Sequence, residues 1–332
     1  MINAPFTHTE KTYRTIMADI LISLSPVLVW SVFIFGARVL TITFITVCSC
    51  VIFDFIARYI FGNRDLIYSF KQATDLSAVV TGVLIVFMLP VTVPLYLPVF
   101  AAFFAIVIAK QAFGGIGRNL VNPAVFAIAV IKITLPSFVD KFTMPYSYFN
   151  AFTSELSSSL IDTVRVFSPL QMLSRDHVYE EGFTDLFFGT SPGNIGEIGI
   201  VFIIIGAIYL SYRKIIDLRG SAAYMAVVFL FSFMFPRGNG ETIYFALTEM
   251  MSGGAVLLSV YACNDFTTTP KQKTGKIIFG AGCGLLTILI RYNFSHFEGA
   301  YVAVLIMNLF TPLINKLTRT VPFGMLNQKN QA

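Results

Sequence analysis

Long, unbroken apolar runs constrain this chain more than any other feature. Residues 16–35 and 39–61 are the clearest, and similar runs recur almost to the C-terminal end. A helix needs about 20 apolar residues to cross the hydrocarbon core of a bilayer. A β-barrel would instead show alternating stretches of about ten residues. Because spanning backbone must satisfy its own hydrogen bonds, the runs predict an all-α integral membrane protein.

The composition supports lipid as the solvent of this chain. Of its 332 residues, 56% are hydrophobic and only 12% are charged, whereas soluble domains carry about 25% charged residues. The formal net charge is +5, but the Lys and Arg residues stand singly or in small groups at the ends of apolar runs. This placement is typical of topology signals, so we expect a lipid bilayer and no nucleic acid as partner.

The apolar runs divide into about ten candidate spans. They cover residues 16–35, 39–61, 76–90, 94–110, 119–136, 197–212, 218–236, 243–262, 275–292 and 299–318. A long polar segment separates the fifth span from the sixth. The predicted organisation is therefore a first five-helix unit (1–136), a polar loop (137–195) and a second five-helix unit (196–332).

The basic residues orient these spans. With ten spans, most of them fall on one side of the membrane, and Arg38 and Arg237 are among the few on the other. The residues on the basic side are Lys11, Arg14, Arg58, Arg64, Lys71, Lys110, Arg118, Arg213, Lys214, Arg219, Lys271, Lys273, Lys276, Lys316, Arg319 and Lys329. The positive-inside rule then predicts a multi-pass membrane protein with both termini cytoplasmic and the acidic loop 137–195 extracytoplasmic.

The two predicted units also share a weak sequence similarity. SAVVTGVLIVFMLP (77–90) and NLVNPAVFA (119–127) in the first resemble SGGAVLLSVYACNDFTTTP (252–270) and GAYVAVLIMNLFTPLI (299–314) in the second. Five spans is an odd number, so the two units would have opposite orientations. This is the pattern of inverted repeats, in which interrupted helices meet near the midplane.

Three local motifs are candidates for function, and each also has a structural interpretation. The stretch KQAFGGIGRNLVNPA (110–124) predicts a tight glycine turn, followed by Asn119 or Asn122 capping the helix at Pro123. The turn PGNIGE (192–197) could hold a ring or a phosphate through backbone N–H groups. Glu197 would then open the sixth span, where the helix dipole favours a carboxylate.

Intramembrane carboxylates form the third group. Glu249 lies well inside the eighth span, and Asp75 lies at the start of the third. Charged groups at such depth handle ions or form structural ion pairs, and both interpretations stay open here. The four cysteines and three histidines show no metal-ligand spacing, so we expect free thiols, no metal site and no catalytic triad.

Several motifs taken together resemble the NqrB/RnfD family. They are DLSAVVTG (75–82), FGGIGRNLVNPA (113–124), PGNIGE (192–197) and RYNFSHFEGAYVAVLIMNLFTPLI (291–314). The resemblance covers nearly the whole chain and is strongest to the D subunit of Rnf-type ion-translocating oxidoreductase complexes. It implies ten helices in two inverted halves, similar to urea-channel-like folds. It also implies electron transfer between ferredoxin and NAD, coupled to Na⁺ or H⁺ movement, with the other subunits as partners.

The resemblance further implies FMN attached through its phosphate to a hydroxyl residue near the extracytoplasmic side. When the family pattern is aligned with this sequence, the acidic position falls on Asp162 and the acceptor position on Ser168. Pro169 follows the acceptor, and Thr163 is an alternative acceptor. Arg165, Val166 and Phe167 replace the small residues that a flavin transferase usually meets. Gly193, Gly196 and Glu197 are expected near the flavin by the same resemblance.

Two other functions remain open. The chain could be a flavin-free structural subunit of the same complex, or a stand-alone channel-like or transporter-like protein. A flavin-bearing subunit would co-purify with membrane partners as yellow protein. A permease would be colourless and would act alone. In each case this chain would lack a complete active site of its own.

Overall fold

The computed structural model describes residues 12–61, 75–115, 117–146, 166–174, 183–237, 241–294 and 298–319. Within these ranges the chain is helical, and the one β-type contact is an isolated bridge between Phe142 and Val166. The predicted all-α class is therefore confirmed. Asp162 and Thr163 fall outside the described residues.

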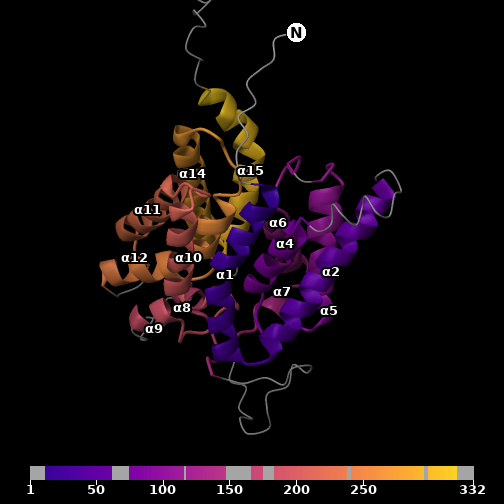
Figure 1. Ribbon diagram of the computed structural model, residues 1–332. Helices are drawn as coiled ribbons and strands as arrows, with labels where there is room; N and C mark the ends of the chain where they lie inside the picture. Colours follow the sequence, from indigo (N-terminus) through magenta and orange to yellow (C-terminus); the bar gives the residue numbers. More distant parts are fainter. Residues whose placement is uncertain are drawn as a thin grey trace, which may run out of the picture.

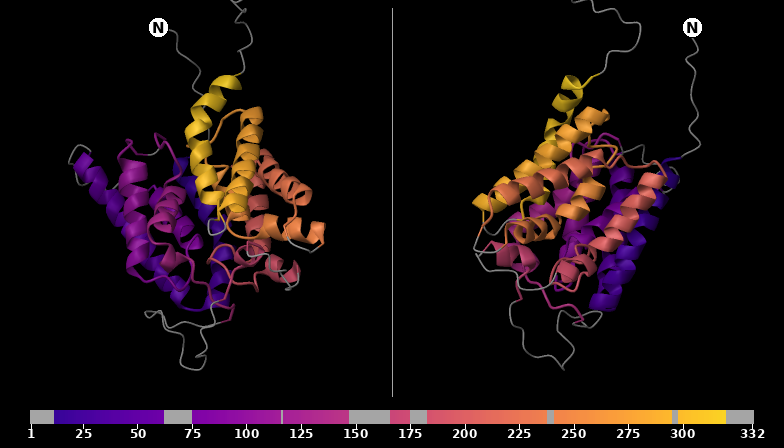
Figure 2. Two further views of the ribbon diagram at one scale, coloured as in Figure 1. Left: turned by 180° about the vertical axis from the view of Figure 1, so that it is seen from behind. Right: turned by 90° about the vertical axis from the view of Figure 1, so that its left-hand side faces the viewer.

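The first unit and the linking segment contain the earlier helices. They are α1 (Tyr13–Phe35), α2 (Arg38–Phe61), α4 (Ser77–Phe87), α5 (Tyr96–Phe103) with the π-helix η1 (Phe104–Gln111), α6 (Pro123–Thr134), α7 (Pro136–Val139), α8 (Pro169–Leu173) and α9 (Phe183–Phe188). The second unit contains α10 (Ile200–Tyr212), α11 (Arg219–Met234), α12 (Thr242–Met251), α13 (Ala255–Leu257) with the π-helix η2 (Leu258–Ala262), α14 (Lys273–Asn293) and α15 (Ala300–Leu317). The two units lie side by side, with α1 packed against α10 between them (Figures 1 and 2).

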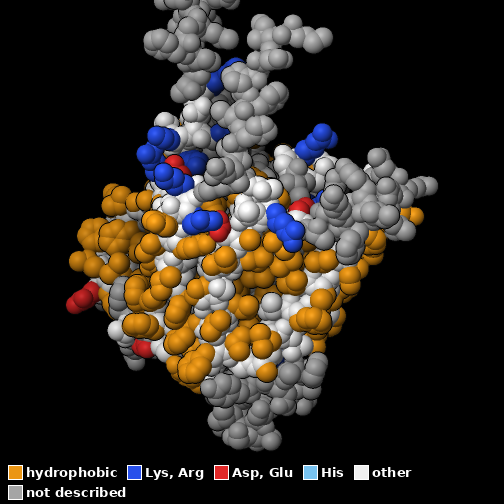
Figure 3. Space-filling model, viewed as in Figure 1, with side chains coloured by type: hydrophobic (Ala, Val, Ile, Leu, Met, Phe, Trp, Pro, Cys, Tyr) orange, Lys and Arg blue, Asp and Glu red, His pale blue; other side chains and the backbone are white. Residues whose placement is uncertain are grey.

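Helix length and composition support a multi-pass membrane protein. Among the described residues, α1, α2, α14 and α15 are each long and apolar enough to cross a bilayer, and α12 with residues 255–262 forms a fifth candidate bent by 61°. Shorter apolar helices fill the remaining predicted runs. On the face that Figure 3 shows, exposed hydrophobic side chains form a broad belt, while Lys and Arg gather at the end where α15 finishes.

The span predicted at residues 76–90 is only partly helical. Its helix, α4, ends at Phe87, and the backbone then runs without regular hydrogen bonding to α5. The side chain of Arg38 is almost completely buried there, and its guanidinium donates to the carbonyl oxygens of Val91 (2.8 Å) and Val93 (2.7 Å). Backbone that leaves a helix inside an apolar body needs such a partner, because no water reaches it.

A second break separates α12 from α13 at residues 252–254. Here the buried guanidinium of Arg291 donates to the carbonyl oxygens of Glu249 (2.7 Å) and Ser252 (2.9 Å). Gly253 at the break has a positive φ of 66°, which favours glycine. Each interrupted segment is therefore stabilised by an arginine from another helix.

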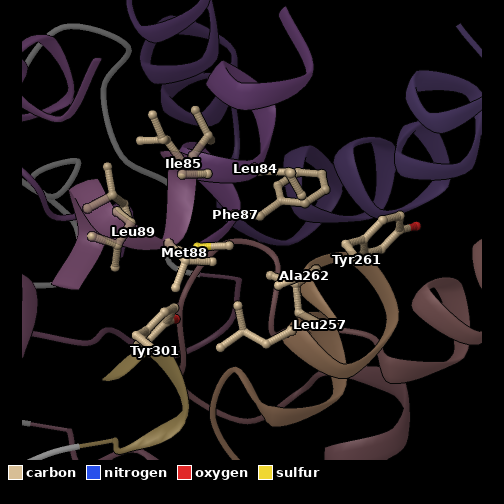
Figure 4. Close-up of a cluster of buried hydrophobic side chains, with 14 of the residues drawn as sticks. Leu84, Ile85, Phe87, Met88, Leu89, Leu257, Tyr261, Ala262 and Tyr301 are labelled. Atoms are coloured by element: carbon tan, nitrogen blue, oxygen red, sulfur yellow. The ribbon is translucent and has the colours of Figure 1, made fainter. Parts of the chain in front are cut away.

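The two interrupted segments meet in the centre of the molecule. Figure 4 shows Phe87 and Met88, from the end of α4, close to Leu257 and Ala262 of the second unit. The turn ahead of α10 also packs onto this end, since the N–H of Gly196 donates to the carbonyl oxygen of Phe87 (2.8 Å). The centre is an apolar contact that joins both units to the linking segment.

The predicted turn and cap between η1 and α6 are confirmed. Gly114, Gly115 and Gly117 all have positive φ angles. Asn122 caps α6, because its side-chain oxygen accepts from the N–H groups of Ala124 and Val125.

Helices α11 and α14 pack closely through two glycines. A Cβ added to Gly280 would lie 2.0 Å from the carbonyl oxygen of Gly220, which is backbone on the facing helix. A Cβ added to Gly282 would instead meet the flexible end of Met307. The helix–helix distance thus depends on Gly280 but not on its neighbour two residues later.

We therefore expect Gly280→Ala to lower the stability of the chain by about 1–3 kcal/mol, since overpacking forces the two backbones apart. The matched variant Gly282→Ala should cost clearly less, because Met307 can change rotamer. The unfolding midpoint of each variant is measured by heating in detergent. Reaction of the buried cysteines with a thiol-reactive dye reports how much protein has unfolded. Equal midpoints for the two variants would contradict this account of the contact.

Candidate functional site

A cavity of about 310 Å³ has charged residues in its walls and is lined in part by α8. Figure 1 shows α8 toward the end of the molecule opposite the one where α15 finishes. The walls of the cavity come from α6, α8, α12, α14 and the segments ahead of α10 and α15. The charged residues in these walls are Lys132, Asp140, Glu197, Arg237, Glu249, Arg291 and Glu298. So many charged groups are unusual inside so apolar a chain and mark the cavity as a candidate site.

Lys132 links the two units at this cavity. It projects from α6, forms an ion pair with the Glu298 carboxylate and lies over the Tyr301 ring, with Nζ 4.5 Å from the ring centroid. The second Glu298 oxygen accepts the N–H of Gly254, at the break between α12 and α13. The pair is almost inaccessible to solvent, so each charge depends on the other.

Glu249 is paired in the same wall. Its carboxylate lies 3.3 Å from the Arg291 guanidinium, and both side chains are buried. The same guanidinium also donates to the backbone carbonyl oxygen of Glu298 (3.0 Å). The structure thus gives Glu249 a cationic partner, in addition to its place at the cavity.

Glu197 has neutral partners. One carboxyl oxygen accepts from the Asn194 side-chain amide (2.7 Å) and from the Tyr301 hydroxyl (3.1 Å). The predicted placement of Glu197 at the opening of a helix is wrong, because α10 begins at Ile200. The carboxyl group instead belongs to the turn that packs against the end of α4, so it points into the protein interior and not along a helix axis.

Arg237 contributes a cation with unused hydrogen-bonding capacity. Its guanidinium stacks on the Tyr292 ring, 3.4 Å from the centroid. Its buried Nη2 atom has no hydrogen-bond acceptor among the residues that the structure describes. An arginine held by stacking while part of its fork is unused can bind a carboxylate or a phosphate.

Ser168 borders this cavity and also a smaller crevice of about 20 Å³. It caps α8: its hydroxyl accepts the N–H of Gln171 (3.3 Å), and the Gln171 side chain accepts the N–H of Ser168 (3.2 Å). Pro169, Gly193 and Glu197 line the same crevice, so the structure brings these four predicted residues together.

The other predicted site residues lie elsewhere. Gly196 packs on Phe87, where an added Cβ would approach within 2.2 Å, so its role is close packing. Asp75 does not line the cavity; its carboxylate pairs with Arg58 (2.8 Å) and accepts the N–H of Ser77 (2.9 Å). Asp162 and Thr163 lie outside the described residues.

Asp75 belongs to a second charged cluster, at the start of α4. There the buried Asp54 carboxylate accepts from Lys110 (2.9 Å) and Arg58 (2.8 Å). Lys110 also donates to the Ser77 hydroxyl (2.7 Å). This cluster ties α2 and η1 to α4, and among the described residues its charges balance in pairs.

Sequence reasoning missed Lys132, Arg237, Arg291 and Glu298. It singled out carboxylates in apolar runs but not cations, although Lys132 stands inside the run 119–136 and Arg291 inside the run 275–292. The rule that marks an intramembrane charge applies to either sign and would have found both. Glu298 and Arg237 sit at run ends, where nothing in the sequence separates them from topology signals.

Comparisons with known proteins match nearly the whole chain to one family. The family model described as the NQR2, RnfD, RnfE family matches residues 1–324. The chain is 31% identical to the D subunit of the Na(+)-translocating ferredoxin:NAD(+) oxidoreductase complex of Acetobacterium woodii, over 99% of this chain and 96% of the relative. It is 30% identical to the D subunit of the proton-translocating ferredoxin:NAD(+) oxidoreductase complex of Clostridium ljungdahlii, over 97% and 95%. It is 26% identical to the D subunit of the ion-translocating oxidoreductase complex of Haemophilus influenzae, strain PittEE, over 96% of each.

We expect Lys132→Met to destabilise the chain by about 3–5 kcal/mol, because it leaves the buried Glu298 carboxylate without its cation. The double variant Lys132→Met/Glu298→Gln should recover part of this loss, since the uncompensated charge is gone. Unfolding midpoints in detergent measure the effect.

The control is an accessible ion pair of the basic end. Asp217 lies 3.7 Å from Arg219, and both are partly exposed. Asp217→Asn should cost less than about 1 kcal/mol. If Lys132→Met cost no more than this control, the Lys132–Glu298 pair would not join the two units.

Proposed function

The chain belongs to the NQR2, RnfD, RnfE family, and from this premise we propose that it is the D-type membrane subunit of an ion-translocating ferredoxin:NAD⁺ oxidoreductase complex. Its partners would be the other membrane and peripheral subunits of that complex. The observation that carries the proposal is the near full-length similarity to D subunits.

We further propose that the cavity holds FMN, attached through its phosphate to Ser168 by a flavin transferase. The residues present fit such a group. Ser168 supplies a hydroxyl that borders the cavity, and Arg237 supplies a guanidinium with an unused donor in the same wall. A phosphoester carries charge that an arginine fork binds well.

The bound flavin would supply the electron-carrying chemistry, and the chain would supply position and electrostatics. Ser168 would fix one end of the group, and the capping bond to Gln171 holds the Ser168 backbone in place. Lys132 and Arg291 keep the neighbouring carboxylates paired, so the wall does not repel incoming negative charge.

A flavin-free subunit of the same complex is the second candidate. Val166 and Phe167 stand directly before Ser168, and Val166 makes the isolated bridge to Phe142. A bulky, paired segment is a poorer substrate for a transferase that needs a slim, extended one. A stand-alone channel-like or transporter-like protein would also lack flavin, but it would purify without partner subunits.

We also propose ten spans in two inverted five-helix units, 1–136 and 196–332, in the bacterial inner membrane with both termini cytoplasmic. In support, each unit has an interrupted segment anchored by a buried arginine, and these segments meet at the centre. The basic end would be cytoplasmic and the cavity extracytoplasmic.

The flavin proposal predicts one FMN phosphoester on the peptide that contains Ser168, in protein purified from cells with a flavin transferase. Ser168→Ala should abolish the adduct, because no other hydroxyl occupies that position. Ser174→Ala is the matched control, since Ser174 lines the same cavity and should leave the adduct intact. Peptide mass spectrometry of the wild-type protein and of the two variants measures the adduct. An unmodified Ser168 peptide, beside other flavoproteins that are modified, would favour the flavin-free subunit.

The topology proposal predicts opposite labelling of two single cysteines in a cysteine-free background. Lys214→Cys, on the exposed turn between α10 and α11, should react with an impermeant maleimide only after cells are opened. Tyr146→Cys, exposed in the polar segment, should react in intact cells. The reverse labelling pattern would show the opposite orientation. Equal labelling of the two cysteines in intact cells would contradict their placement on opposite sides of the membrane.

A further inference from the structure

The walls of the cavity contain more carboxyl groups than cations. Glu197, Glu249 and Glu298 are carboxyl groups, and Lys132 and Arg291 are cations. Asp140 and Arg237 also line the cavity and are of opposite sign, so they do not change this difference. If all three glutamates were ionised, the interior would hold one uncompensated negative charge, which burial strongly disfavours.

The contacts of the carboxyl groups show where the excess lies. Glu249 contacts Arg291, 3.3 Å away, and is accounted for. Glu197 and Glu298 line the same cavity beside Tyr301: its hydroxyl donates to Glu197 (3.1 Å), and the Lys132 ammonium that pairs with Glu298 lies over its ring. Two carboxyl groups that depend on one ammonium group cannot both be ionised in such a site, so one of them holds a proton.

The surrounding donors decide which member of the pair holds the proton. Glu298 contacts the Lys132 ammonium and accepts the N–H of Gly254, and both contacts favour its ionised form. The hydrogen-bond donors to Glu197 are neutral, Asn194 and Tyr301, and they use mainly one of its two oxygens. The second oxygen receives one long bond, from the Asn194 N–H (3.3 Å), and can carry the proton toward Glu298.

We propose that Glu197 is a neutral carboxylic acid in the resting protein, and that the Glu197–Glu298 pair is a proton-exchange site of the cavity. Lys132 is its positioning residue, because it fixes the charge on Glu298. The cavity lining includes the exposed Pro136, and in the orientation proposed above this part of the cavity faces the outer aqueous side, which would supply a proton to the pair.

The role of this proton rests on the function proposed above. Glu197 and Ser168 line the same cavity and the same crevice. A carrier held at Ser168 that gained negative charge would share the cavity with the Glu197 proton. Glu197 would then give up one proton and remain as a carboxylate, and a hydronium ion from solvent would reprotonate it and leave water. No electron passes through the pair, and the charge of the carboxyl pair is unchanged over the exchange.

The first experiment is infrared spectroscopy of the full chain in its purified complex, in the carbonyl-stretching region of protonated carboxylic acids. We expect a band that shifts in D₂O, is lost in Glu197→Gln and is kept in Glu249→Gln, the matched control. Glu197→Asp should move the band without removing it, which separates the result from misfolding. Lys132→Met should about double the band, because Glu298 then also takes a proton. A wild-type spectrum without the band, or a band that survives Glu197→Gln, would overturn the proposal.

The second experiment tests the exchange itself. Chemical reduction of the complex, followed by fast infrared difference spectroscopy, should show a transient loss of the Glu197 band and its recovery from water. An unchanged band through reduction would overturn the exchange step, whatever the resting spectrum shows. The adduct on the Ser168 peptide is measured separately, so a failure of the carrier proposal is distinguishable from a failure of the proton-exchange site.

Discussion

The structure depends on satisfying backbone groups where helices stop inside an apolar body. Lipid and packed hydrocarbon offer no hydrogen bonds, so each interrupted segment needs a donor from elsewhere. Arg38 provides it for the carbonyls after α4, and Arg291 provides it for the carbonyls between α12 and α13. Arginine suits this task because its planar fork presents several donors and remains charged. Without these two side chains, the central meeting of the two units would leave unpaired carbonyls.

The burial of Arg291 also accounts for part of the charge in the walls of the cavity. Arg291 can be buried only with a compensating carboxylate, which Glu249 supplies, and Lys132 likewise brings Glu298. Each charge in the wall requires a partner of opposite sign, and the resulting ionic network has one carboxyl group more than it has cations. The function proposed for this cavity would therefore use groups whose first requirement is structural, and Glu197 is the glutamate of this network whose hydrogen-bond donors are neutral.

The sequence predicted the helical class and the long helices well, because a long hydrophobic run is typical of a helix in contact with lipid. The run 39–61 became α2 (Arg38–Phe61), and the run 299–318 became α15 (Ala300–Leu317). It predicted the interrupted spans less well, since a run such as 243–262 does not reveal a bend of 61°. Of the site, Ser168, Pro169, Gly193 and Glu197 were found through resemblance, and they do lie together. Lys132 and Glu298 were missed because their meaning lies in a contact across 166 residues, which no local pattern contains.

That separation has a consequence for how the chain enters the membrane. Lys132 is synthesised long before Glu298, so α6 must leave the ribosome with a lysine whose partner does not yet exist. An unpaired lysine is costly within hydrocarbon, so α6 is a poor candidate for early, independent insertion. We infer that it waits at the translocon or at the lipid interface until α15 arrives. The ion pair between Lys132 and Glu298 therefore also makes the order of assembly matter: the helices up to α6 are complete in sequence, but not in charge, until Glu298 has been synthesised.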